Sequence, residues 1–449
     1  MVIIFMVVAT ALVAASAPDP RSSEVSLSWF LSRAATVSGF LTPSGSDSRM
    51  SKNTSDTIRM VAAMGTRYAG RAAFVWGNEQ NIPQILPELQ ANAQLLHARS
   101  PDTILEGAIF EIVTRAGVEA LSVPGYVLQA FGQPASSRRF NYTAMLFPDG
   151  SFVDHWSKGA SVPDMTQLES RMWFFYVGSS YLSHGCEALH LGQMMLMSKH
   201  DVHMRRTYEL LTKLRAFAAT HARRGYVLCN AHLYREPWVH FNGTRKLVFD
   251  LHAFPSRPLP LIKSPIDCVL NASFEDAIYG RSAGGIAAQG SWTTASLPYM
   301  VELDNYYCTS PNPDSDHDSN PTLNLNQVEL DNYDCTAHPG VQDPADLAHP
   351  FGWDEISWFA HRTAGEQAEW LRYATGWLSS HDPAGHFEMP GQRPLCDSHF
   401  AHRLNIKYFS ASGDLGEGGF AQEQTIRGIW DAQAGSRPAC ARCGRVAGA

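Results

Sequence analysis

The sequence predicts an α/β fold, built as a single (β/α)8 barrel. Apolar, strand-like segments alternate along the chain with helix-like segments of a dozen or more residues, an order that requires parallel strands joined by helical crossovers. Seven or eight such units can be counted, which favours a closed barrel over an open, doubly wound sheet. The glycine-rich segment 280–285 has no strand before it, so it does not form the phosphate-binding motif of a dinucleotide fold.

Each element follows from a local pattern. Strands are predicted where short apolar runs are bounded by turn residues, and helices where apolar residues recur every three or four positions. The predicted strands span residues 70–77, 103–114, 186–193, 226–233, 246–254, 298–306 and 385–391. The predicted helices span residues 82–98, 163–182, 205–225 and 364–380. Gly225 is a typical helix stop, and the chain runs directly from it into the next strand.

The two ends of the chain are expected to lie outside the barrel. Residues 1–17 are a short apolar run ending in Ala-Ser-Ala, typical of a cleaved signal peptide. No later segment is long enough to cross a bilayer, so we expect a secreted protein with no stable membrane insertion after cleavage. Residues 18–60 are predicted to be a Ser-rich lead-in, 61–410 the barrel, and 411–449 a flexible Gly/Ala-rich tail.

Other features agree with the secretory pathway. Sequons for N-glycosylation occur at Asn53, Asn141, Asn242 and Asn271. The 8 cysteines suit an oxidising compartment but are too sparse for a disulfide scaffold.

The formal net charge of −8, without any basic run, argues against a nucleic-acid partner.

One segment interrupts the alternation of strands and helices. The sequence VELDNYYCT from Val301 recurs as VELDNYDCT from Val328. We expect only the first copy to be a barrel strand, because apolar residues precede it. The second copy would lie in an acidic loop insertion over 308–350, tied by a disulfide between Cys308 and Cys335. A local duplication or a faulty gene model explains the repeat as well as a function does.

Polar residues inside the predicted strands indicate a site. Alternate side chains of a strand share a face, and the carboxyl ends of barrel strands surround one pocket. If the large aliphatic residues cover the helices, the polar residues between them point to the barrel axis. The residues selected in this way, or by their place at a strand end, are Trp76, His190, Gln193, Asn230, His232, Asp250, His252, Glu302, Asp304 and Glu388. Any one of them alone is more often a structural group than a catalyst.

Paired carboxylates among aromatic and imidazole side chains resemble the site of TIM-barrel glycoside hydrolases. The resemblance implies a carbohydrate substrate and cleavage of a glycosidic bond. It makes Glu302 the nucleophile or base and either Asp250 or Glu388 the acid. The other selected residues would bind the substrate, with Asn230, His232 and His252 on its hydroxyls.

Two alternatives stay open. His232, Asp250, His252 and Glu302 together have the donor types of a zinc or manganese site, which would make the protein a metal-dependent hydrolase or isomerase. A barrel that binds carbohydrate without catalysis is the other alternative. No complete metal or cofactor motif is present in the sequence, and the acidic run 314–320 lacks the glycine of a calcium loop, so we expect no cofactor.

Overall fold

The computed structural model describes most of the predicted barrel. The described residues are 17–45, 53–233, 238–241, 243–256, 259–261, 264–269, 284–304, 355–360, 362–395, 407–411 and 419–436. Almost all of the predicted signal peptide, the sequons at Asn242 and Asn271, the insertion 308–350 with its Cys308–Cys335 disulfide, and the end of the tail lie outside them. Of the described cysteines, Cys186 and Cys229 are buried free thiols.

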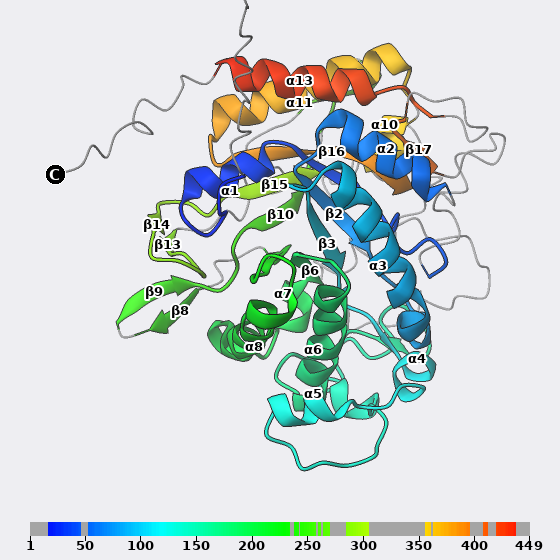
Figure 1. The fold of residues 1–449 in the computed structure, drawn as a ribbon, viewed down its shortest axis with the longest axis vertical. Coiled ribbons are helices and arrows are strands. Elements are labelled where there is room, and N and C mark those ends of the chain that lie inside the picture. Colours follow the sequence, from blue (N-terminus) through cyan, green and yellow to red (C-terminus); the bar gives the residue numbers. More distant parts are fainter. Residues whose placement is uncertain are drawn as a thin grey trace, which may run out of the picture.

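Parallel strands form a nearly closed barrel, which confirms the predicted fold class (Figure 1). Around the barrel the order is β10 (His252–Pro255), β15 (Tyr299–Glu302), β16 (Gly385–Pro394), β1 (Ala34–Val37), β2 (Tyr68–Ala73), β3 (Ile104–Ala108), β6 (Ala188–Gln193) and β7 (Leu228–His232). At the seam between β7 and β10, the amide of Asp250 donates to the carbonyl of Cys229. On the neighbouring strands β15 and β16, Glu302 and Glu388 are in register.

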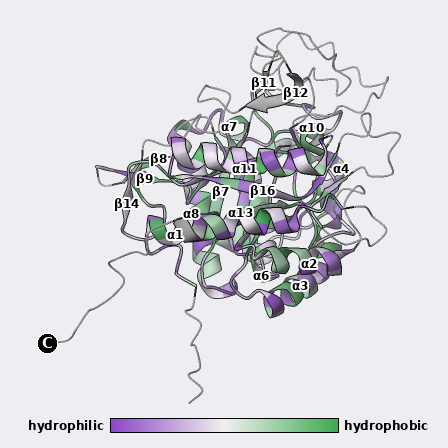
Figure 2. Ribbon diagram, turned by 90° about the horizontal axis from the view of Figure 1, so that it is seen from above, coloured by the Kyte–Doolittle hydropathy of each residue, from purple (hydrophilic) through white to green (hydrophobic). Residues whose placement is uncertain are grey.

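Helices surround the strands. The barrel helices are α2 (Thr54–Met64), α3 (Ile82–Arg99), α6 (Leu168–Ser183), α8 (Arg205–His221), α10 (Glu355–Ala360), α11 (Ala364–His381) and α13 (Glu423–Ser436). Hydrophilic and hydrophobic residues alternate along α11 and α13, as expected for helices with one face on the strands and the other on solvent (Figure 2). In α11, Trp370, Leu371 and Leu378 are among the residues buried against the sheet.

The remaining elements are shorter. They are α1 (Glu24–Leu31), η1 (Glu79–Asn81), β4 (Val113–Thr114), α4 (Arg115–Glu119), α5 (Gly125–Ala130), η2 (Thr143–Met145), β5 (Ala160–Ser161), α7 (Met194–Met197), η3 (Val202–Met204), β8 (Trp238–Phe241), β9 (Thr244–Leu247), β11 (Leu259–Leu261), β12 (Ser264–Val269), β13 (Gly285–Ile286), β14 (Thr293–Thr294) and β17 (Lys407–Phe409). The last of these pairs with β16 in the antiparallel direction. The pair β4 and β5 brackets a long excursion between β3 and α6.

The boundaries differ from the sequence prediction at both ends. The stretch 18–60, expected to be a lead-in, contains α1, β1 and the first part of α2, and the predicted tail contains α13. The strand β1 was missed because it is short and made of small residues, Ala-Ala-Thr-Val, in a Ser-rich context. Its partners are β2 and β16, so the barrel begins with this strand.

An apolar layer fills the amino-terminal half of the barrel interior. Leu27, Phe30 and Leu31 of α1 cover this end of the strands. They pack with residues from separate strands, namely Ala34, Tyr68, Ile104, Ala188, Leu228 and Met300, and with Leu251 just before β10. The polar part of the interior therefore begins above this layer, toward the carboxyl ends.

The prediction that Asp250 and His252 point to the barrel axis is wrong. Leu251 belongs to the apolar interior layer, so its two neighbours face outward. The carboxylate of Asp250 accepts hydrogen bonds from Arg215 of α8 at 3.0 Å and from Gln289 at 2.9 Å. Leu251 faces inward here, so the assumption that large aliphatic residues always face the helices failed.

We expect Asp250 to stabilise the fold through its ion pair with Arg215. Both side chains are largely buried, so Asp250→Ala leaves an uncompensated guanidinium and should lower the free energy of unfolding by about 3 kcal/mol, measured by urea denaturation. The double variant Asp250→Leu with Arg215→Met should recover most of this loss. As a control, Glu209→Ala removes an exposed pair with Arg206 and should cost less than about 0.5 kcal/mol. An equal cost for both single variants would contradict this assignment.

Candidate functional site

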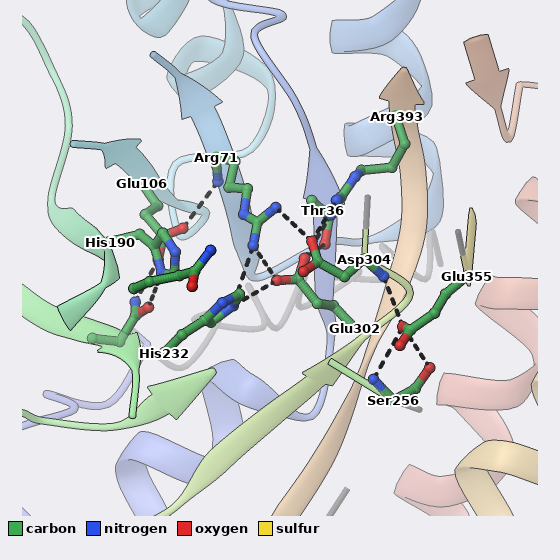
Figure 3. A network of polar contacts seen from close by, with 12 residues as sticks. Thr36, Arg71, Glu106, His190, His232, Ser256, Glu302, Asp304, Glu355 and Arg393 are labelled. Carbon is green, nitrogen blue, oxygen red and sulfur yellow. Dashed lines mark hydrogen bonds and ion pairs between the residues drawn. The ribbon is translucent and has the colours of Figure 1, made fainter. Parts of the chain in front are cut away.

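Charged side chains from several strands meet inside the barrel, above the apolar layer (Figure 3). We use the name Glu302 cluster for Glu302, Asp304, Arg71, Arg393 and His232. They come from the strands β15, β2, β16 and β7, with Asp304 just after the end of β15. Glu302 is 1% exposed, whereas the side chains of Arg71, His232 and Asp304 keep 10% to 13% of their surface accessible. These three side chains therefore form the solvent-facing side of the cluster.

Glu302 lies at the centre of the cluster. Its Oε2 accepts from Nη1 of Arg393 at 2.6 Å, and its Oε1 accepts from Nη2 of Arg71 and lies 3.1 Å from Nε2 of His232. Burial by itself would raise the pKa of this carboxyl, but the two guanidinium groups outweigh burial and lower the pKa to about 2. Glu302 is therefore ionised at every physiological pH.

The same two arginines also hold Asp304. Its Oδ1 accepts from Nη1 of Arg71 at 3.2 Å and from Nη2 of Arg393 at 3.0 Å. The backbone amide of Asp304 donates to Oε2 of Glu355 at 2.9 Å, and the Ser256 hydroxyl donates to that same oxygen. Glu355 thus ties the carboxyl ends of β15 and β10 together and fixes the position of Asp304 (Figure 3).

The backbone of Arg71 is unusual for a strand residue. Its φ is +52°, in the left-handed region, and the register of β2 against β3 shifts between Ala69 and Ala73. A bulge of this kind re-aims a side chain, and strain of this kind accumulates at functional sites. Here the amide of Arg71 donates to Oε1 of Glu106 at 3.0 Å, while its guanidinium reaches Glu302.

Glu388 differs sharply from Glu302, its neighbour in register. A Cβ atom at Gly70 would overlap the Glu388 carboxyl and lie 3.6 Å from Oε1 of Glu106, so the missing side chain at Gly70 makes room for these acids. Burial raises the pKa of Glu388 well above its usual range, and the nearby charges of Glu302 and Glu106 raise it further. Burial and these two charges therefore both favour the protonated form of Glu388.

A second polar chain lies beside the cluster. Oε2 of Glu106 accepts from the Tyr68 hydroxyl and from Nδ2 of Asn230, the latter at 2.5 Å. Oδ1 of Asn230 is 2.6 Å from Nδ1 of His190. The ring of His190 lies 5.0 Å from that of His232, centroid to centroid, so this chain adjoins the Glu302 cluster.

Aromatic side chains line one side of the same end of the barrel. Trp76 is 41% exposed and contacts the rings of Phe110 and Trp156, with centroid distances of 5.4 and 5.1 Å. Gln193 is held beside them, since its Nε2 donates to Oε1 of Glu111 at 3.2 Å. Exposed aromatic faces of this kind suit a ligand with one apolar face.

The structure therefore brings together most of the residues predicted from sequence. Those in or beside the cluster are Glu302, Asp304, Glu388, His232, His190 and Asn230, while Trp76 and Gln193 lie at the aromatic side. Asp250 and His252 are not part of the site. His252 faces outward, its ring contacts Phe254, and burial lowers its pKa to about 3. The residues of the site that were not predicted from the sequence are Arg71, Arg393, Glu106, Tyr68 and Glu355. The signal for Arg71 was a charged residue inside an apolar strand.

Three residues have donor atoms close enough for a metal ion. Among the described residues, ligand atoms of His232, Glu302 and Asp304 all lie within 4.8 Å of one another. The other members of the set predicted from sequence, Asp250 and His252, lie on the outer face. Both carboxylates of the group already face two guanidinium groups, whose positive charge disfavours a divalent cation. The donor types fit zinc, but their electrostatic surroundings do not.

Comparison of the chain with family models finds no match, and comparison with curated protein sequences finds none either. The site must therefore be interpreted from its own geometry. Among the described helices, none has the length and apolar character needed to span a membrane.

The opposite pKa shifts of the two acids predict a pH dependence of stability. Because the folded-state pKa of Glu388 is raised, this group costs stability as pH rises above its unfolded pKa of about 4.3. Glu388→Gln removes that cost, so its advantage over the wild type should grow by up to about 1.4 kcal/mol per pH unit above that value. Urea unfolding at pH 4 to 8 measures the difference. A constant difference at every pH would contradict a protonated Glu388.

The electrostatics also predict that no divalent metal is held by His232, Glu302 and Asp304. Elemental analysis of the purified protein, after dialysis without chelator, should find zinc and manganese far below one equivalent. Stoichiometric metal that is lost in the variant His232→Ala would contradict this prediction and favour the metal-dependent alternative.

Proposed function

We propose that this barrel protein hydrolyses a glycosidic bond. The proposal rests on one observation, that Glu302 and Glu388 are neighbours in register whose pKa values are shifted in opposite directions. A pair of carboxyl groups kept in different protonation states at one pH is what acid and base assistance to glycoside cleavage requires.

Each carboxyl group has a separate role in this mechanism. Glu388, protonated, donates its proton to the oxygen of the leaving group. Glu302, ionised, attacks the anomeric carbon or activates a water molecule. Retaining enzymes hold their two carboxyl groups about 5–5.5 Å apart, and inverting enzymes hold them about 6.5–9.5 Å apart. The backbones of adjacent strands lie about 4.8 Å apart, so the side chains of two residues in register can reach the shorter separation. We therefore assign Glu302 as the nucleophile and expect retention of configuration.

The surrounding residues support binding of a carbohydrate. Trp76 and Phe110 offer apolar faces to a sugar ring, and His232 and Asp304 offer polar atoms on the solvent-facing side of the cluster. Arg71 and Arg393 keep Glu302 ionised. Secretion, predicted from residues 1–17, would bring such an enzyme to extracellular glycans and is part of this proposal.

One observation favours a second candidate, a barrel that binds carbohydrate without cleaving it. Both carboxylate oxygens of Glu302 are engaged by guanidinium groups. A carboxylate paired in this way is a weaker nucleophile than a free one, because its negative charge is already compensated. The two candidates share the ligand class and differ in turnover.

Substitution of the two acids tests the mechanism. With aryl glycosides as substrates, Glu302→Gln should reduce kcat by at least about 10³-fold, because the nucleophile is lost. Glu388→Gln should reduce kcat by about 10²-fold or more on poor leaving groups and much less on activated ones, which need no proton. Proton NMR of the first product formed should show retained anomeric configuration.

The matched control is Asp250→Asn, which keeps a polar group on the outer face and should leave kcat unchanged. Circular dichroism and thermal melts of all variants exclude loss of fold as the cause. Full activity in Glu302→Gln would remove this residue from the mechanism. Binding of glycans by the wild type with no hydrolysis of any of them would favour the second candidate.

A further inference from the structure

One nitrogen of His190 is buried without a hydrogen-bond partner. The residue is 1% exposed, and Nδ1 lies 2.6 Å from Oδ1 of Asn230. Among the described residues, no group hydrogen-bonds to Nε2. A buried polar atom with no partner is uncommon in a folded protein and needs an explanation, and beside the Glu302 cluster a ligand is one group that could supply the missing partner.

The neighbouring hydrogen bonds determine which nitrogen of His190 carries the proton. The Asn230 amide group has its Nδ2 directed at Oε2 of Glu106, at 2.5 Å, and at the Tyr68 hydroxyl oxygen, at 3.0 Å. The Tyr68 hydroxyl donates its proton to Glu106, so its oxygen can only accept from Asn230, and the amide oxygen of Asn230 is the atom that faces His190. An amide oxygen only accepts, so Nδ1 of His190 must donate. In the neutral ring Nε2 therefore carries no proton and can only accept a hydrogen bond.

Several features keep the ring neutral. Burial lowers the pKa of His190 well below its usual range, and the positive charge of Arg71 acts in the same direction. The hydrogen bond with Asn230 and the charge of Glu302 oppose this shift but do not reverse it. The acceptor character of Nε2 therefore persists across physiological pH.

The surroundings of His190 suit a ligand with an apolar face. The ring of Phe110 lies 6.1 Å from that of His190, centroid to centroid, and Phe110 also contacts the exposed Trp76. The aromatic side chains thus continue from solvent at Trp76 to His190. On its other side His190 adjoins His232, which contacts Glu302.

We propose that Nε2 of His190 accepts a hydrogen bond from one hydroxyl group of a bound sugar, whose ring packs against Phe110 and Trp76. This subsite rests on the proposed function for its ligand class but does not depend on hydrolysis. The unprotonated Nε2 cannot form a hydrogen bond with an ether oxygen or a carboxylate, because these groups have no proton to donate. The subsite therefore requires a free hydroxyl at this position of the sugar and rejects derivatives that lack it.

The tautomer is tested first, without ligand. In the ¹⁵N NMR spectrum of histidine-labelled protein, His190 is assigned by the signals lost in His190→Phe. The expected spectrum shows the proton on Nδ1, none on Nε2, and no titration between about pH 5 and 8. A proton on Nε2, or titration in that range, would overturn the proposal.

The ligand class is tested with methyl glycosides of the common hexoses and pentoses, and with their monodeoxy and mono-O-methyl derivatives. At least one methyl glycoside should shift the Nε2 resonance, and His190→Phe should weaken its binding by about tenfold or more in calorimetry. His221→Gln, an exposed histidine on α8, is the control and should change the affinity little. One monodeoxy derivative should bind the wild type more weakly than the parent glycoside by a similar factor. The substitution His190→Phe should not weaken the binding of this derivative any further.

The outcomes separate this proposal from the proposed function. Failure of every probe to shift the Nε2 resonance, or equal discrimination against the deoxy sugar by the wild type and His190→Phe, overturns the subsite. Hydrolysis of aryl glycosides with unchanged KM in His190→Phe overturns it too and leaves the catalytic proposal standing. A sugar bound at His190 without any hydrolysis supports the subsite and overturns catalysis.

Discussion

The pairing of Glu302 with Arg71 and Arg393 is the constraint on which the carboxyl-terminal half of the barrel depends. An ionised carboxylate that is 1% exposed would be costly to bury alone, and two guanidinium groups offset that cost. The same guanidinium groups bind Asp304, so two carboxylates and two guanidinium groups form one cluster in which the charges balance. The strands that carry these residues must keep their register for the set to exist, which links the geometry of the barrel to the charge state of the site.

Accommodating a third acid beside this set requires space and neutrality. Gly70 supplies the space, since any side chain there would overlap the Glu388 carboxyl. Neutrality comes from a proton, because burial and the negative charge next to Glu388 both raise its pKa. The left-handed backbone of Arg71, the residue after Gly70, directs the guanidinium toward Glu302. Adjacent residues of one strand thus create the two opposite environments of Glu302 and Glu388.

The sequence predicted the architecture because the alternation of strands and helices is a strong, repeated signal. It also predicted that Glu302 and Glu388 share a face, since the period of a strand is two. The same rule failed at Asp250 and His252, because it assumed that large aliphatic residues always face the helices. Leu251 instead fills the apolar layer that α1 closes. Arg71 was missed because only a bulge, which has no clear sequence pattern, turns its side chain to Glu302.

The connection between β1 and β16 has a consequence for how the chain is made. Ala35 pairs with Met389, so β1 waits for a segment that is synthesised about 350 residues later. Until that segment is synthesised, β1 has β2 on one side and an open edge on the other. Contacts of such long sequence separation slow folding, and an open edge of this kind invites association between nascent chains. The small residues of β1, Ala-Ala-Thr-Val, offer little apolar surface to such encounters, which fits a strand that must remain unpaired for a long time.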